Sequence, residues 1–258
     1  MNIYGAEFYR LLDENEGHAF FELSEVKVGE KEYTVAEFKP VNSLLNNCYK
    51  IAKEKCLYTM DEGQDLQKRS YQKKLINQFK GIMAEMAIHI YCYECLGLKR
   101  NEVLRWDLER PDYKSAENEY DLKVTLSDCD FIIESRSSSS YKSRLNAFMK
   151  YYDIIGRYSN DIKQNEKVSD LYVRPVFQYS YFMDKEAYNE AVYRTFDDIS
   201  KGLLKLYLVA SVGKEEMYGE LGYFKTMGQG STKYRCIKII NAHDIEEMKR
   251  IIMKAKRS

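Results

Sequence analysis

The sequence predicts an α/β fold in which helices flank a mixed β-sheet. Three observations support this prediction: a long amphipathic helical pattern, two alternating segments joined by a short loop, and a nearly continuous apolar segment typical of a fully buried strand. Along the chain, the predicted elements follow the order helix, two strands, helix, strand. We therefore expect a sheet-based core with elaborations at its N- and C-terminal ends.

The composition indicates a globular protein with a substantial core. The chain has 258 residues, of which 45% are hydrophobic and 31% charged, and only three are prolines. These values exclude a disordered or low-complexity class. Six cysteines are too few for a disulfide scaffold, and thiols are expected. No apolar run approaches a membrane span and no signal-peptide pattern opens the chain, so a cytoplasmic protein without membrane contact is predicted.

The overall charge gives no sign of a nucleic-acid partner. Forty basic and forty acidic side chains leave a formal net charge of zero. A neutral chain can still bind DNA when its basic residues gather on one face, because counterion release depends on local phosphate contacts. Charge therefore neither establishes nor excludes DNA binding.

The sequence predicts an N-terminal elaboration over residues 1–65. It contains short alternating pieces and a helix over residues 43–56. A longer helix is predicted over residues 66–98, because its apolar residues recur at steps of three and four, and Gly97 is a natural end. Residues 66–258 are predicted to form the main domain with a C-terminal extension.

Two strands, residues 120–125 and 131–136, follow the long helix and are predicted to pair as a hairpin. Side chains alternate across a strand, so Asp121 and Lys123 share one face of the first strand. Glu134 and Arg136 share one face of the second. Pairing of the strands would let the carboxylates of Asp121 and Glu134 converge.

The remaining elements are predicted from capping, turn and hydropathy patterns. The serines of residues 137–140 are expected to cap a helix with an apolar stripe from Leu145 to Ile155. Further on, the patterns predict a strand over 171–182 bent at Pro175, a helix over 185–202, a strand over 203–212, a loop over 213–233, a strand over 234–240 and a helix over 244–254.

Two convergent carboxylates beside a cation are suited to metal-assisted phosphodiester hydrolysis. Magnesium prefers oxygen ligands and keeps several waters, so a small number of carboxylates is sufficient to hold it. A cationic side chain offsets charge that develops on the phosphoryl group. Asp121, Glu134 and Arg136 are therefore the first candidate residues.

These residues resemble the PD-(D/E)xK restriction-endonuclease superfamily. Asp121 lies on one strand, and Glu134-Ser135-Arg136 on the next takes the place of the family's acid-x-lysine element. The preceding helix carries a similar Gly-x-x-x-Glu pattern that ends at Glu85, and the resemblance spans residues 80–177. It implies a restriction-endonuclease-like fold and Mg²⁺-dependent cleavage of double-stranded DNA in restriction or anti-phage defence, with Asp121, Glu134 and Glu85 as metal ligands.

Arg136 departs from the family pattern, since arginine is a planar, permanently charged fork rather than a compact ammonium donor. The resemblance then implies that Arg136 clamps the scissile phosphate while Lys123 or Lys142 supplies the ammonium. The residues expected to contact DNA are Lys142, Arg144, Ser137 and Ser138. A homodimer is expected, because two sites are needed to cut both strands.

Two other functions remain open at this point. The first is a catalytically inactive, nuclease-fold DNA-binding or regulatory subunit of a defence complex, for which Arg136 is the main argument. The second is a zinc or thiol enzyme that uses Cys92 and Cys95, although this pair lies on a predicted helix and has no second cysteine pair to complete a zinc site.

Overall fold

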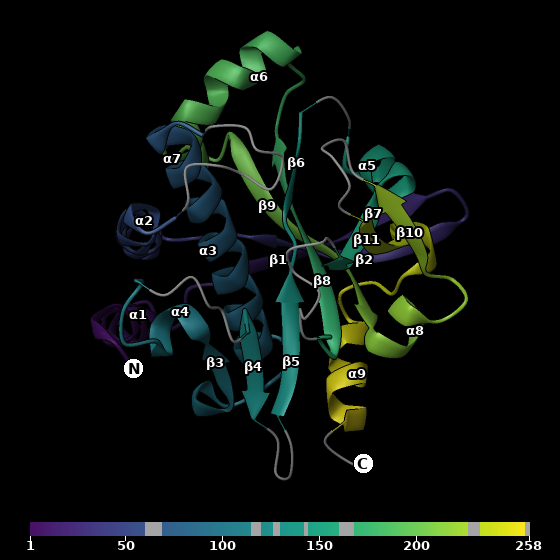
Figure 1. Cartoon of the computed structure of the whole chain (residues 1–258), viewed down its shortest axis with the longest axis horizontal. Helices are drawn as coiled ribbons and strands as arrows, with labels where there is room; N and C mark the ends of the chain where they lie inside the picture. The colour runs from purple at the N-terminus through teal and green to yellow at the C-terminus, as the bar shows by residue number, and fades with distance from the viewer. Residues whose placement is uncertain are drawn as a thin grey trace.

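A large, mostly antiparallel β-sheet organises the fold, and helices flank it (Figure 1). This computed structural model describes residues 1–59, 69–114, 120–125, 130–141, 144–159, 168–226 and 233–255. Within those residues the strands of the large sheet follow the order β1-β2-β9-β8-β5-β4-β3, and β6 pairs with β8. A smaller sheet has the order β10-β11-β7. The α/β class with a mixed sheet is therefore confirmed.

The strands are β1 (Phe21–Val28), β2 (Lys31–Phe38), β3 (Val103–Arg105), β4 (Leu122–Thr125), β5 (Asp130–Ser135), β6 (Ser138–Ser140), β7 (Asp153–Ser159), β8 (Leu171–Tyr179), β9 (Leu204–Gly213), β10 (Tyr223–Thr226) and β11 (Lys233–Lys238). The α-helices are α1 (Ile3–Glu14), α2 (Asn42–Leu57), α3 (Tyr71–Glu94), α4 (Trp106–Glu109), α5 (Leu145–Tyr151), α6 (Lys185–Ala191), α7 (Thr195–Ser200), α8 (Lys214–Tyr218) and α9 (Glu247–Ala255). Short 3₁₀ turns are η1 (Arg100–Glu102), η2 (Val192–Arg194) and η3 (Ile239–Asn241).

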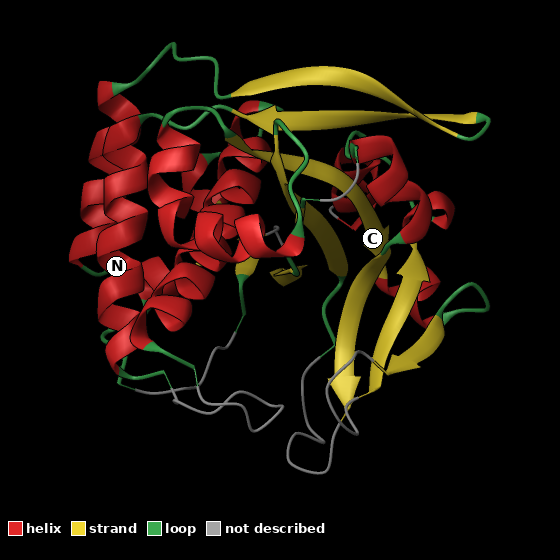
Figure 2. Ribbon diagram, turned by 90° about the horizontal axis from the view of Figure 1, so that it is seen from above, coloured by secondary structure: helices red, strands yellow, loops and turns green. Residues whose placement is uncertain are grey.

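The two faces of the large sheet bury different cores. One core packs α1, α2 and α3 against side chains of β2, β4, β5, β8 and β9. The other lies between the sheet and the elements α5, α8, β7 and β11. Figure 2 shows the longer helices gathered on one side of the large sheet and the smaller sheet on the other. Both faces are covered, which explains the continuous apolar pattern of β9.

Helix α3 is the central helix of the first core. Its N-terminus is capped by Ser70, whose side chain accepts a hydrogen bond from the amide of Lys73. Most of its residues are buried, including Phe79, Ile82 and Met86 of the predicted apolar stripe. Gly97 follows the helix with a φ of 72°, as expected at a helix end. Among the described residues no helix has both the length and the hydropathy needed to cross a membrane.

The N-terminal segment joins the same sheet and core as the rest of the chain. Strand β2 pairs with β9, with Ala36 opposite Leu208, and α1 packs its buried Phe8 into the first core. The sequence pattern did not predict α1, which begins where the Asn2 side chain accepts from the amides of Tyr4 and Gly5. The domain boundary near residue 65 stays a prediction.

The predicted hairpin and the bent strand are confirmed. Strands β4 and β5 pair antiparallel, with Leu122 opposite Ile133. Strand β8 carries a register shift at Pro175, as expected for a residue that cannot donate a ladder hydrogen bond. Strand β8 runs parallel to β5 and antiparallel to β9.

The prediction that the serine run caps a helix was wrong. Residues 138–140 form β6, which pairs with residues 176–178 of β8. Helix α5 begins later, after Arg144, and Ile155 belongs to β7 rather than to that helix. The physical reason is that β8 offers unpaired backbone groups to β6, and this long-range pairing outweighs the local capping preference of serine.

Two further boundaries also differ from the predictions. The helix predicted over 185–202 is divided into α6, η2 and α7. The loop predicted over 213–233 contains α8 and β10, and its residues 227–232 lie outside the described part of the chain.

Because α1 contributes to the main core, Phe8→Ala is expected to lower the free energy of unfolding by about 3–5 kcal/mol. Phe224, which is 64% exposed on β10, is the matched control, and its replacement by alanine is expected to change stability by less than about 0.5 kcal/mol. Urea unfolding measures both values. Equal effects of the two substitutions would contradict the packing of α1 described here.

Candidate active site

Asp121 and Glu134 lie at neighbouring ends of β4 and β5, where the sequence predicts a shared site (Figure 1). Asp121 immediately precedes β4, and the β4–β5 register continued by one residue places it opposite Glu134. The side chain of Asp121 is held in place, because its Oδ2 accepts a hydrogen bond of 2.9 Å from the backbone amide of Ser135. Its carbonyl accepts from the amide of Trp106 at 3.3 Å.

Glu85 of α3 lies close enough to Asp121 for their charges to interact. Burial raises the pKa of Glu85 well above its ordinary value, and the carboxylates of Asp121 and Asp107 raise it further. Burial also raises the pKa of Asp121, although Arg136 and the Ser135 amide favour its charged form. The two carboxylates therefore oppose each other's ionisation, and a bound cation would relieve that opposition.

A buried ion pair that the sequence analysis missed borders these carboxylates. The Nζ of Lys55 on α2 lies 2.9 and 2.8 Å from Oδ1 and Oδ2 of Asp107 on α4. Burial disfavours the charged form of Lys55, but Asp107 and Glu85 more than offset it, so its pKa is raised. Lys55 therefore stays protonated and offsets part of the negative charge.

Arg105 is the second cation near Glu85 that the sequence analysis missed. Its side chain is fully buried, and its three guanidinium nitrogens find no hydrogen-bond partner among the described residues. The guanidinium carbon lies 5.0 Å from the centre of the Phe8 ring. Arg105 lies on β3, far from Glu85 in the sequence, so the chain pattern gave no signal that the two would meet.

Glu134 and Arg136 form an ion pair with each other. Arg136 Nη2 lies 2.7 Å from Glu134 Oε1, and both side chains remain partly exposed. The backbone pairing places Glu134 opposite Tyr172 on β8. Arg136 is also close enough to Asp121 to favour its charged form. Arg136 thus links the two acids that the sequence predicted as metal ligands.

The other predicted site residues have different surroundings. Lys123 forms an ion pair of 3.1 Å with Asp130, so its ammonium is directed to that carboxylate. Lys142 lies outside the described residues. Arg144 is exposed at the start of α5, and Ser137 is half-buried between β5 and β6.

Two buried cations hold the serines of β6. Arg174 donates to the carbonyl of Arg136 at 2.6 Å and to the hydroxyl of Ser138 at 2.7 Å. Lys80 donates to the hydroxyl of Ser139 at 3.0 Å, and burial lowers the pKa of Lys80 to about 8. Ser138, predicted to contact DNA, therefore has a structural partner, and β6 is fixed beside the carboxylates.

The donor set at Glu85 and Asp121 fits a hard divalent cation. Both side chains offer oxygen, and the nearby Ser135 hydroxyl is buried with no hydrogen-bond partner among the described residues. Magnesium can take the rest of its ligands from water and phosphate. In the same described residues, no group of three or more His, Cys, Asp or Glu side chains is arranged to hold a metal. The roles of Asp121, Glu134 and Glu85 as metal ligands therefore stay predictions.

The thiol pair does not have the properties of a reactive site. Cys92 is fully buried on α3, and Cys95, directly after that helix, is partly buried. Burial raises the pKa of both thiols, that of Cys95 to about 11. A thiolate, which is the nucleophile and the metal ligand, is thus disfavoured at both residues.

The raised pKa of Glu85 predicts a pH-dependent gain in stability from Glu85→Gln. Protonated Glu85 stabilises the folded state at acidic pH, and this stabilisation is lost as the pH rises through its raised folded-state pKa. Glutamine does not ionise, so the stability that it provides does not fall with pH. With a chelator present, the substitution is expected to raise Tm by about 2–4 °C at pH 8, roughly 1 kcal/mol, and by less at pH 5.

The matched control is Glu190→Gln at an exposed position of α6, which is expected to leave Tm unchanged at both pH values. Differential scanning calorimetry gives both values. A Glu85→Gln variant that is less stable than wild type at both pH values would show that the ionised carboxylate is well accommodated, contrary to this description.

Comparison with known proteins gives one informative match. The chain is 27% identical over 230 residues to an uncharacterized protein of Methanocaldococcus jannaschii, and the alignment covers 81% of this chain and 82% of the relative. No family model matches the chain. No solved structure matches it either. The chain is therefore similar along most of its length to a protein whose name states no activity.

Proposed function

We propose that this protein is a Mg²⁺-dependent endonuclease that hydrolyses phosphodiester bonds in double-stranded DNA, in restriction or anti-phage defence, on a restriction-endonuclease-like fold. The observation that carries the proposal is that Asp121, fixed by the Ser135 amide, lies close enough to Glu85 and Arg136 for their charges to interact. Three of these four residues belong to the pattern that resembles the PD-(D/E)xK superfamily, and Ser135 lies within its acid-x-cation element.

The order of elements around the site supports the proposed fold. Helix α3 carries Glu85, β4 and β5 form the hairpin with Asp121 and Glu134, and α5 and β8 follow. The predicted order of helix, two strands, helix and strand is present, with β3, α4, β6 and β7 inserted among these elements. Strand β8 returns parallel to β5, so the helix-containing segment between them crosses from one strand to the other.

Each residue of the site has a role that its surroundings support. Glu85 and Asp121 would hold the cation, and the Ser135 amide fixes the orientation of Asp121. When bound, the cation would lower the pKa of a coordinated water and withdraw charge from the phosphoryl oxygens. Lys55, held protonated by Asp107, limits the accumulated negative charge.

Arg136 is the residue best suited to the scissile phosphate. Its guanidinium is partly exposed, always charged, and able to donate two parallel hydrogen bonds to phosphate oxygens. Glu134 holds it at 2.7 Å, so Glu134 acts in this proposal by orienting Arg136 rather than as a third metal ligand. Lys123 has no part in the proposed mechanism, since it is engaged by Asp130.

The Glu134–Arg136 ion pair also favours a second candidate function. If Glu134 stays bound to Arg136, the site keeps two carboxylates and has no free lysine in the family's usual place. A protein of this kind would bind DNA without cutting it and would serve as a regulatory subunit of a defence complex.

Cleavage of supercoiled plasmid in Mg²⁺ tests the proposal. Asp121→Asn and Glu85→Gln are each expected to lower the nicking rate by about 100-fold or more, because each removes a carboxylate from the cation site. Asp197→Asn, at an exposed position of α7, is the matched control and is expected to cut like wild type. A chelator is expected to stop cleavage by all of them.

Equal nicking by wild type, Asp121→Asn and Glu85→Gln would contradict the proposal, because the activity would then come from another source. Absence of nicking by wild type, together with equal plasmid binding by all variants in a gel-shift assay, would favour the inactive subunit instead.

A further inference from the structure

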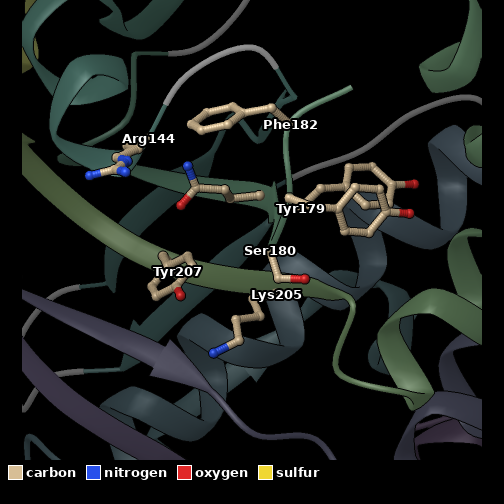
Figure 3. A pocket seen from close by; sticks show the side chains of 8 residues that line it. Arg144, Tyr179, Ser180, Phe182, Lys205 and Tyr207 are labelled. Atoms are coloured by element: carbon tan, nitrogen blue, oxygen red, sulfur yellow. The ribbon is translucent and has the colours of Figure 1, made fainter. Parts of the chain in front are cut away.

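An aromatic cavity of about 370 Å³ lies apart from the carboxylates, at the end of β8 and the start of β9 (Figure 3). Its volume is within the range of roughly 300–1,000 Å³ typical of small-ligand sites. Phe182, Tyr207, Arg144 and Lys205 contribute to its lining, together with Tyr181 and with Tyr179, whose ring is buried in the first core. Among the described residues, no acidic side chain belongs to its lining.

One wall of the cavity is held rigid by Glu37 of β2. The hydroxyl of Tyr207 donates to Glu37 Oε2 at 3.1 Å, and the Nζ of Lys205 lies 3.0 Å from Glu37 Oε1. Tyr207 and Lys205 are two residues apart on β9, so both point to the same side of the sheet. This wall therefore needs little reorganisation to receive a ligand.

The mouth of the cavity is lined by exposed apolar surface. Phe182 is 60% exposed and Tyr181 is 44% exposed, although both lie next to a cavity they could help to close. In Figure 3 Phe182 lies on one side of the cavity, with Tyr207 and Lys205 on the other. A flat ligand between them would cover the exposed ring of Phe182.

The polar groups of the cavity match a nucleotide. Arg144 is exposed at its edge and forms no ion pair within the described residues, so its charge is available to an anion. Gln178 and Ser180 line the cavity with an amide and a hydroxyl, which can donate to and accept from the edge of a base. Aromatic rings that stack on a base, with cations for its phosphate, are the usual means of binding unpaired nucleic acid.

We propose that this cavity binds a nucleotide, with the base between Phe182 and Tyr207 and the phosphate at Arg144. The ligand is either a free nucleotide or an unpaired nucleotide of a DNA strand. This binding does not depend on the proposed cleavage, since none of Glu85, Asp107, Asp121 and Glu134 lines the cavity.

The geometry of β8 also relates the cavity to the candidate active site. Ser135 pairs with Val173, and Gln178 follows five residues later on the same strand. At about 3.3 Å per residue the two places are roughly 16 Å apart along β8. One DNA strand could therefore reach both, and this part of the inference rests on the proposed function.

Fluorescence titration with 2-aminopurine tests the proposal without cleavage, because it is performed in a chelator. One arm uses the 2-aminopurine 5′-deoxynucleotide and the other a single-stranded oligonucleotide with one central 2-aminopurine. Phe182→Ala is expected to weaken binding by about 5- to 100-fold through loss of stacking. Arg144→Gln is expected to weaken it and to lower the salt dependence of binding to the oligonucleotide by about one charge.

Phe224→Ala and Arg250→Gln are the matched controls, because each replaces the same exposed residue type on a distant element, and both are expected to bind like wild type. Binding in the first arm alone identifies a free nucleotide, and binding that requires the oligonucleotide identifies a strand. Absence of binding in both arms, or equal binding by Phe182→Ala and Phe224→Ala, would overturn the proposal.

Asp121→Asn separates this inference from the proposed nuclease. The variant is expected to bind the 2-aminopurine 5′-deoxynucleotide like wild type, because Asp121 lies outside the cavity. Binding of 2-aminopurine through Phe182 without any DNA cleavage would support the nucleotide site and contradict the proposed nuclease. Cleavage of DNA without binding of the probes would support the nuclease and contradict the nucleotide site.

Discussion

The structure depends most on the placement of Glu85 and Asp121, two half-buried carboxyl groups whose charges interact. Burial raises the pKa of both carboxyl groups, and the charge of Asp121 raises that of Glu85 further, so the two cannot both ionise without cost. The unfavourable interaction of these carboxylates lowers the free energy of unfolding at neutral pH. Such a loss of stability is common at sites where a ligand supplies the missing charge. A divalent cation is the simplest ligand of that kind, because oxygen donors and negative charge are what magnesium requires.

The surrounding elements hold the side chains of Glu85 and Asp121 in position. The Lys55–Asp107 pair ties α2 to α4, and Arg105 places a further cation inside the core beside Glu85. On the sheet side, the amide of Ser135 fixes Asp121, while Arg174 fixes the backbone at Arg136. The carboxylates are therefore positioned by both the helical layer and the sheet, and Arg136 remains partly exposed beside them.

The sequence predicted the elements that neighbouring residues specify by their periodicity or hydropathy. The periodicity of α3, the alternation of β4 and β5, and the apolar run of β9 each indicated the observed element. The same patterns placed Asp121 and Glu134 at adjacent strand ends. Strand β6 was missed because it exists only through its pairing with β8, and serine alone favours a helix cap.

The candidate site could be predicted only in part, for the same reason. Glu85 and Asp121 belong to a recognisable pattern, but Lys55, Asp107 and Arg105 reach the site through packing between distant segments. The role of Glu134 also depended on tertiary detail, since alternation gives the face of a strand but not the partner of a side chain. Its ion pair with Arg136, two residues away, competes with the predicted metal ligation.

A crystal of the protein soaked in Mn²⁺ would test the central claim most directly, since manganese takes the oxygen ligands that magnesium prefers and can be located by its anomalous scattering. The account predicts one strong anomalous peak bound by carboxylate oxygens of both Glu85 and Asp121. A map with no peak between these two side chains, obtained at a manganese concentration that fills other carboxylate sites on the protein, would contradict it.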